Sequence, residues 1–157
     1  MTTPKNLEPV SNFEIDRYLG TWYEIARLDH SFERGLIDVT AEYRSREDGG
    51  VDVINRGRDS ESGEWNEALG KAYLAGDEGS GMLKVSFFGP FYGGYNVIAL
   101  DQDDYQWSLV AGPNRAYLWI LSRTPKLSPK TKNQLLRFAE ERNFAIDELI
   151  WVEQQAD

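Results

Sequence analysis

The sequence predicts an all-β fold, an eight-stranded antiparallel up-and-down barrel with a helix packed outside it. Eight segments alternate apolar and polar residues at intervals of about ten residues, which is typical of strands with one buried face. Short turns rich in Gly, Asp and Ser separate these segments, so neighbouring strands are expected to run antiparallel. One amphipathic helical segment follows them near the C-terminus.

Length and composition fit one folded domain with a sizeable core. The chain has 157 residues, of which 41% are hydrophobic and 13% aromatic. Its net charge of −9 argues against nucleic acid as a partner, because phosphate binding draws on clustered Lys and Arg. The chain contains no cysteine, which excludes disulfides and thiolate metal sites within it. No apolar run reaches the roughly 18 residues needed to span a bilayer.

The N-terminal part predicts an extended arm over residues 1–11, and the barrel domain then occupies residues 12–157. Asn12 is a residue type that caps helices, so a short helical turn is expected over residues 13–19. The predicted strands are 21–28, 38–46, 51–58, 66–75, 82–88, 94–101, 105–112 and 116–123. Eight such strands form a sandwich or close into a barrel, and an eight-stranded barrel has room for side chains or one small ligand.

The C-terminal segment changes to helical periodicity. Ser128 is a favourable N-cap, and Pro129 fits the first helical position. A helix is therefore predicted over about 128–142. A last short strand is predicted over about 149–152, where the apolar run Leu-Ile-Trp-Val follows the helix.

Three short motifs resemble the lipocalin family. Residues 20–22, Gly-Thr-Trp, resemble its Gly-x-Trp signature on the first strand. Asp-Tyr at 104–105 resembles the pair between its sixth and seventh strands, and Arg123 resembles the arginine that ends its eighth strand. The segments 86–101 and 117–129 closely resemble the bacterial branch, whose members are typically outer-membrane lipoproteins related to apolipoprotein D.

This resemblance implies how the barrel is closed. The turn at residues 13–19 would close one end, the other end would be open, and the helix would pack outside. In lipocalins the tryptophan of the first strand packs inside the closed end against the late arginine. Trp22 and Arg123 are therefore expected to form a structural floor, with a cation–π contact contributing about 1–2 kcal/mol.

Strand periodicity predicts the inner face of the barrel. If Arg123 points inward, every second residue of the eighth strand points inward too. The same reasoning on the other strands gives an inner face that is mainly apolar and has few polar groups. This is the usual composition of a small-molecule site. The candidate ligand-binding residues are Ala26, Val39, Ala41, Tyr43, Val53, Asn55, Ala72, Val85, Phe87, Tyr95, Val97, Tyr117, Trp119 and Leu121. The apolipoprotein D pattern implies ligand contact at Asn55, Phe87, Tyr95 and Trp119.

The predicted function is binding, storage or transport of a small hydrophobic ligand, a fatty acid or lysophospholipid, inside the barrel. No cofactor and no metal are expected, because Asp101, Asp103 and Asp104 lie in an Asp-rich turn without EF-hand spacing. The single histidine, His30, lies in a polar loop and is expected to be solvated.

Two alternatives stay open. One is an enzyme that acts on a hydrophobic substrate with Glu24 or a pocket tyrosine as acid or base. The other is a protein-interaction module with a filled barrel and an exposed Trp151. The chain is expected not to be an enzyme, because one loop histidine and no cysteine leave the usual nucleophile–base pairs absent.

Partners and location follow from the same reasoning. The expected partner is the hydrophobic ligand, and self-association as a homodimer is left open. Contact with a membrane is expected only through a lipid anchor, and the chain carries no anchor cysteine. If a lipoprotein signal and that cysteine precede the chain, the expected location is the periplasmic face of the bacterial outer membrane; otherwise it is cytoplasmic.

Overall fold

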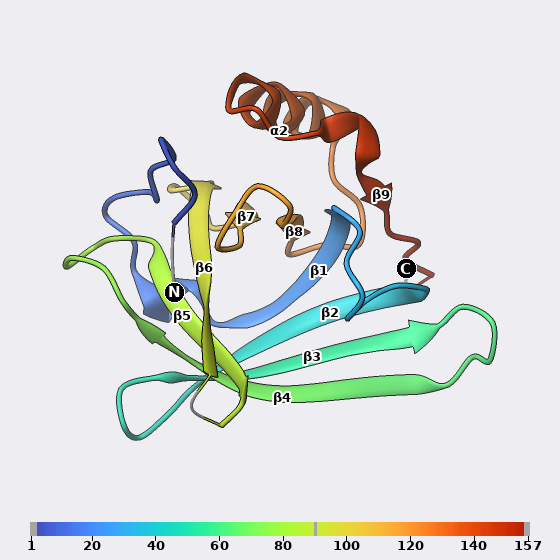
Figure 1. The fold of residues 1–157 in the computed structure, drawn as a ribbon, viewed down its shortest axis with the longest axis horizontal. Helices are drawn as coiled ribbons and strands as arrows, with labels where there is room; N and C mark the ends of the chain where they lie inside the picture. The colour runs from blue at the N-terminus through green and yellow to red at the C-terminus, as the bar shows by residue number, and fades with distance from the viewer. Residues whose placement is uncertain (1–2, 90, 156–157) are drawn as a thin grey trace.

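A closed antiparallel barrel of eight strands forms the body of the protein in the computed structural model, which describes residues 3–89 and 91–155 (Figure 1). The strands are β1 (Gly20–Arg27), β2 (Leu36–Ser45), β3 (Val51–Asp59), β4 (Trp65–Leu74), β5 (Met82–Phe88), β6 (Phe91–Leu100), β7 (Trp107–Ala111) and β8 (Leu118–Ser122). Each strand pairs with the next along the chain, and β1 pairs with both β8 and β2. The predicted up-and-down barrel is therefore confirmed.

β-Bulges in β1 and β6 change which residues of these two strands face the barrel interior. The pairing register shifts in β1 between Glu24 and Ala26, and in β6 between Val97 and Ala99. A bulge adds one residue to a strand, so the alternation of faces is reversed beyond it. Ala26 and Ala99 therefore pack in the apolar cluster outside the barrel. The prediction that Ala26 lies on the inner face is wrong for this reason.

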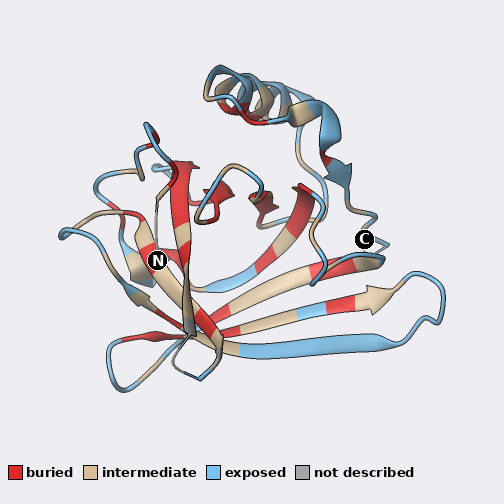
Figure 2. Ribbon diagram, viewed as in Figure 1, coloured by how far each residue is buried: buried red, intermediate tan, exposed pale blue. Residues whose placement is uncertain are grey.

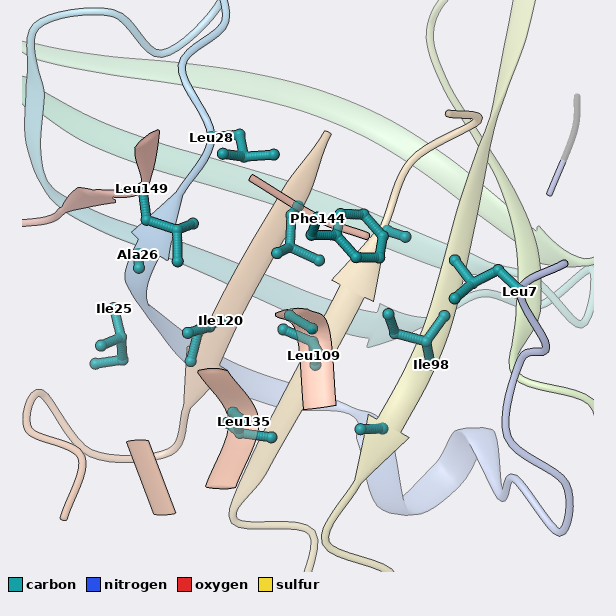
Figure 3. Close-up of a cluster of buried hydrophobic side chains, with 14 residues drawn as sticks. Leu7, Ile25, Ala26, Leu28, Ile98, Leu109, Ile120, Leu135, Phe144 and Leu149 are labelled. Carbon is teal, nitrogen blue, oxygen red and sulfur yellow. The ribbon is translucent and has the colours of Figure 1, made fainter. Parts of the chain in front are cut away.

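The helix α2 (Pro129–Glu141) covers one side of the barrel, as predicted. The hydroxyl of its N-cap Ser128 accepts a hydrogen bond from the backbone N–H of Thr131. Leu135 packs with the outward side chains of Leu109 and Ile120 in an apolar cluster (Figure 3). Burial therefore differs around the barrel, and β4, away from the helix, is largely exposed (Figure 2).

The last described segments of the chain lie on the outer surface of the barrel. A 3₁₀ turn, η1 (Ile146–Glu148), leads to the short strand β9 (Ile150–Trp151), which pairs with β1. The N-terminal arm also adheres to the barrel, since the backbone N–H of Val10 donates to the carbonyl of Val97 at 2.8 Å. Among the described residues, no helix has the length and apolar character to cross a bilayer.

The closed end is built around Trp22. The short helix α1 (Ile15–Tyr18) crosses this end, and the Trp22 indole N–H donates to the carbonyl of Tyr18 at 2.9 Å. The guanidinium carbon of Arg123 lies 3.8 Å from the centre of the Trp22 ring, which is the expected contact. Arg123 also donates to three main-chain carbonyl oxygens from other segments. The first strand, the last strand and α1 are thus tied together.

Candidate ligand-binding site

A cavity of about 130 Å³ lies inside the barrel, with Ile15 and Tyr18 of α1 among its lining residues. Its wall is mainly aliphatic and aromatic, and side chains from β1, β2, β3, β4, β5, β6, β7 and β8 contribute to it. The barrel interior is therefore hollow, which argues against a filled barrel.

Most of the predicted inner-face residues line this cavity. They are Val39, Ala41, Tyr43, Val53, Asn55, Ala72, Val85, Phe87, Tyr95, Trp119 and Leu121. Most of them follow the strand period of two, and Phe87 lines the cavity within the register shift of β5 between Val85 and Phe88. Their contact with a ligand stays a prediction.

Three predicted residues do not line the cavity. Ala26 lies outside the barrel because of the bulge in β1. Val97 is completely buried in the interior cluster, where neighbouring side chains cover it. Tyr117 precedes β8 and stacks on Trp119 with ring centres 6.2 Å apart. It belongs to the turn before β8 and is not among the residues that line the cavity.

Three tyrosine hydroxyls meet in the deep part of the cavity. The hydroxyl oxygen of Tyr95 lies 2.7 Å from that of Tyr18 and 2.9 Å from that of Tyr43. Tyr18 also lies 3.0 Å from the Ser108 hydroxyl. Burial raises the pKa of Tyr18 to about 12 and raises the pKa values of Tyr43 and Tyr95 as well. These hydroxyls therefore stay neutral and form a hydrogen-bonded chain.

A second polar group lies toward the open end of the barrel. Glu24 on β1 is 5% exposed, and its carboxyl group accepts a hydrogen bond of 3.0 Å from Arg27, which is 2% exposed. Glu33, in the loop between β1 and β2, accepts a hydrogen bond of 2.9 Å from the indole N–H of Trp119. His30 Nε2 lies 2.7 Å from the same Glu33 oxygen. We call these five residues the carboxyl cluster.

The pKa values of the two carboxyl groups in this cluster are shifted in opposite directions. Burial raises the pKa of Glu24 well above its usual range, and the adjacent Glu33 raises it further. Burial also acts to raise the pKa of Glu33, but hydrogen bonds from His30, Glu24 and Trp119 lower it to about 2. Glu33 is therefore ionised at neutral pH, and Glu24 keeps its proton to a higher pH than an ordinary glutamate does.

Sequence reasoning missed most of this cluster. The expectation that His30 is solvated is wrong: its side chain is 10% exposed, and its ring centre lies 5.5 Å from that of Trp119. Arg27 was not predicted to be inside, because the bulge that turns it inward leaves no mark in the alternation pattern. Glu33 belongs to a loop, so only its tertiary contacts reveal its position.

Comparison with known proteins shows which sequences this chain resembles. Residues 13–154 match the model of the lipocalin-like domain. The chain is 55% identical to the outer membrane lipoprotein Blc of Vibrio cholerae, over 97% of this chain and 89% of that protein. It is 56% identical to Blc of Escherichia coli K12, over 98% and 86% of the two chains. Apolipoprotein D of Bos taurus is 30% identical, over 91% and 78%.

A solved structure supports the fold independently. Insecticyanin from the tobacco hornworm Manduca sexta superposes with a TM-score of 0.78, covering 97% of this chain and 86% of that one, at 20% sequence identity. The likeness to insecticyanin shows the fold alone. The domain match and the high identity to the bacterial relatives show that the sequences are similar as well. The chain therefore belongs to the lipocalin family.

Proposed function

We propose that the barrel interior binds the hydrocarbon chain of a single-chain lipid, a fatty acid or a lysophospholipid, for storage or transport. The observation that carries this proposal is the apolar cavity, bounded at the closed end by Ile15 and Tyr18 of α1 and lined by side chains from all eight strands. The membership of the lipocalin family supports binding of a small hydrophobic ligand.

The dimensions of the cavity favour one slender chain. Its volume of about 130 Å³ lies below the roughly 300 Å³ at which sites enclosing a drug-sized ligand begin. A single alkyl chain can enter such a space lengthwise and leave its polar end toward the opening. Each methylene removed from water contributes about 0.8 kcal/mol before the costs of ordering are subtracted.

Lipid analysis of the purified protein tests the proposal. Organic extraction followed by mass spectrometry should recover single-chain lipids, and the delipidated protein should bind a fluorescent fatty acid. Titration with non-fluorescent lysophospholipid should displace that fatty acid in proportion to the occupied sites. The proposal fails if no lipid is recovered and the fluorescent fatty acid does not bind.

Val85→Asp is expected to weaken binding of the fluorescent fatty acid at least about tenfold, because a carboxylate on the cavity wall loses its hydration when the alkyl chain enters. Lys84→Asp is the matched control, since Lys84 is the preceding residue of β5 and does not line the cavity. Its affinity should stay within about threefold of the unmodified protein. Equal losses in both variants would mean that the lipid binds elsewhere.

The bacterial relatives also support a location. Their printed names describe outer membrane lipoproteins, so we infer that this protein belongs to the outer membrane through a lipid anchor. The codons upstream of the sequence test this inference: they should encode a hydrophobic signal that ends in a cysteine. Homodimer formation stays a prediction, which sedimentation at several protein concentrations would check.

The absence of catalysis also stays a prediction. Glu24, the proposed acid or base of the alternative enzyme, already bonds to Arg27 and Glu33 within the carboxyl cluster. These contacts support a role in arranging the cavity wall. Lipids incubated with the protein should therefore be recovered chemically unchanged.

A further inference from the structure

The hydrogen-bonded hydroxyls in the deep part of the cavity carry one proton more than their mutual contacts use. Tyr43 contacts Tyr95, Tyr95 contacts Tyr18, and Tyr18 contacts Ser108, at 2.9, 2.7 and 3.0 Å between the oxygen atoms. We call these four residues the hydroxyl chain. Each hydroxyl has one proton to donate, so four protons serve three contacts. Within the part of the protein that the structure describes, these hydroxyls make no other hydrogen bond, and one proton therefore lacks an acceptor.

Three members of the hydroxyl chain face the cavity, and the fourth does not. Tyr18, Tyr43 and Tyr95 line the cavity, whereas Ser108 is completely buried and lies outside its wall. A buried donor without a partner is costly, so the favourable arrangement has Ser108 donating to Tyr18. The unused proton then belongs to a tyrosine that lines the cavity. Burial raises the pKa values of all three tyrosines, so at neutral pH they remain protonated donors.

The electrostatic environment of this deep part favours a neutral oxygen as the acceptor. The ring of Tyr18 lies 4.8 Å from that of Trp22, and the guanidinium of Arg123 lies against Trp22. This positive charge attracts the negative end of a bond dipole. No basic residue is among the described residues that line the cavity, so an ionised head group would lose its hydration there without a counter-ion. A neutral oxygen accepts the unused proton without that cost.

We propose that the hydroxyl chain binds a carbonyl oxygen near the far end of the ligand's alkyl chain, so that the protein prefers single-chain lipids with an oxo group close to their last carbon. This inference rests on the proposed function and keeps the polar head group at the opening. A lipid that ends in hydrocarbon leaves the tyrosine donor unpaired. A ligand hydroxyl brings a further proton and leaves the same excess, whereas a carbonyl oxygen accepts and donates nothing.

Three fatty acids of equal length test this preference. They carry a ketone, a secondary alcohol or a methyl branch at the carbon before the last, so the substituents are similar in size. Each competes with the fluorescent fatty acid below micelle formation, in a series from decanoate to hexadecanoate that moves the substituted carbon along the barrel. At the best length the oxo acid should bind about threefold or more tightly than the methyl-branched acid, and more tightly than the hydroxy acid.

The inference is overturned if the oxo acid binds no more tightly than the methyl-branched acid at every length. An apolar cavity without a free donor would give that result, because a carbonyl group loses its hydration on entry. If no acid of the series competes, whether substituted or not, the proposed function itself fails.

Removal of the whole hydroxyl chain assigns the preference to it. The variant combines Tyr18→Phe, Tyr43→Phe, Tyr95→Phe and Ser108→Ala, which keeps the rings and leaves no hydroxyl of the group without its partner. In this variant the oxo acid should bind more weakly than the methyl-branched acid. Unsubstituted fatty acids should bind within about threefold of their affinity for the unmodified protein. A larger loss for them would place the carboxylate head group at the tyrosines and overturn the inference.

Asn55→Leu is the matched control. Asn55 is another polar side chain of the cavity wall, on β3, and leucine has a similar size. The preference for the oxo acid should be unchanged in Asn55→Leu. Loss of the preference in this variant would assign the oxygen to the amide of Asn55 and overturn the role of the hydroxyl chain.

Infrared spectroscopy gives a second measurement that needs no variant. An isotope label at the oxo carbon separates its carbonyl stretching band from those of the protein. A carbonyl that accepts a hydrogen bond stretches at a lower frequency than one in an apolar solvent. The oxo acid of the best length should therefore absorb at a lower frequency when bound than when dissolved in hexane. An equal frequency in the two environments would overturn the inference.

Discussion

Trp22→Ala is expected to lower the free energy of unfolding by about 3–5 kcal/mol, the usual cost of removing a buried aromatic side chain. The Trp22 side chain is completely buried, and its ring contacts Arg123 at the end of the barrel. Its loss leaves a void and removes the donor to the Tyr18 carbonyl. Because domains are stable by about 5–15 kcal/mol in total, urea denaturation should show a much lower midpoint.

Trp65→Ala is the control for this effect. Trp65 begins β4 and is 52% exposed, with the guanidinium of Arg56 lying 4.9 Å from its ring centre. An exposed contact of this kind contributes about 0.5–1 kcal/mol, so the midpoint should move little. Equal losses of unfolding free energy in the two variants would mean that the contact of Trp22 with Arg123 does not stabilise the closed end.

The barrel could be predicted because its strands and turns depend on local patterns, and its floor could be predicted because of the family resemblance. Alternation and turn residues predicted the eight strands within a few residues of the observed bounds. The pairing of Trp22 with Arg123 needed more than alternation, since the two residues are 101 positions apart. It was predicted from the family resemblance, which brings the first and last strands together.

Reading inward residues from alternation failed where the strands are irregular. A bulge depends on how two neighbouring strands pair, and the sequence of one strand does not display that pairing. Ala26 was placed inside for this reason, and Arg27 was not. The carboxyl cluster was missed because its members come from a bulged strand, a loop and β8, and their closeness exists only in the folded chain.

Glu24→Gln is expected to make the protein more stable than the unmodified chain at neutral and higher pH. The pKa of Glu24 is raised in the folded state by burial and by Glu33. A raised folded-state pKa gives a stabilisation that is complete below the unfolded-state pKa of about 4.3 and is lost as pH rises toward the folded-state value. Within that interval the cost grows by about 1.4 kcal/mol for each pH unit.

Glutamine avoids this cost because it has no proton to lose. Its amide can donate to Glu33 and accept from Arg27, as the protonated Glu24 does. The difference in unfolding free energy between Glu24→Gln and the unmodified protein should therefore increase from pH 5 toward pH 8, with the slope of about 1.4 kcal/mol per unit as its upper limit. Urea denaturation at several pH values measures that difference.

Glu61→Gln provides the reference for changes in surface charge, because Glu61 is exposed in the turn between β3 and β4. Its stability relative to the unmodified protein should be nearly independent of pH over the same range. If the difference in unfolding free energy for Glu24→Gln were also independent of pH, Glu24 would ionise in the folded protein with its ordinary pKa. The cavity wall would then hold two negative charges at neutral pH, contrary to the raised pKa of Glu24.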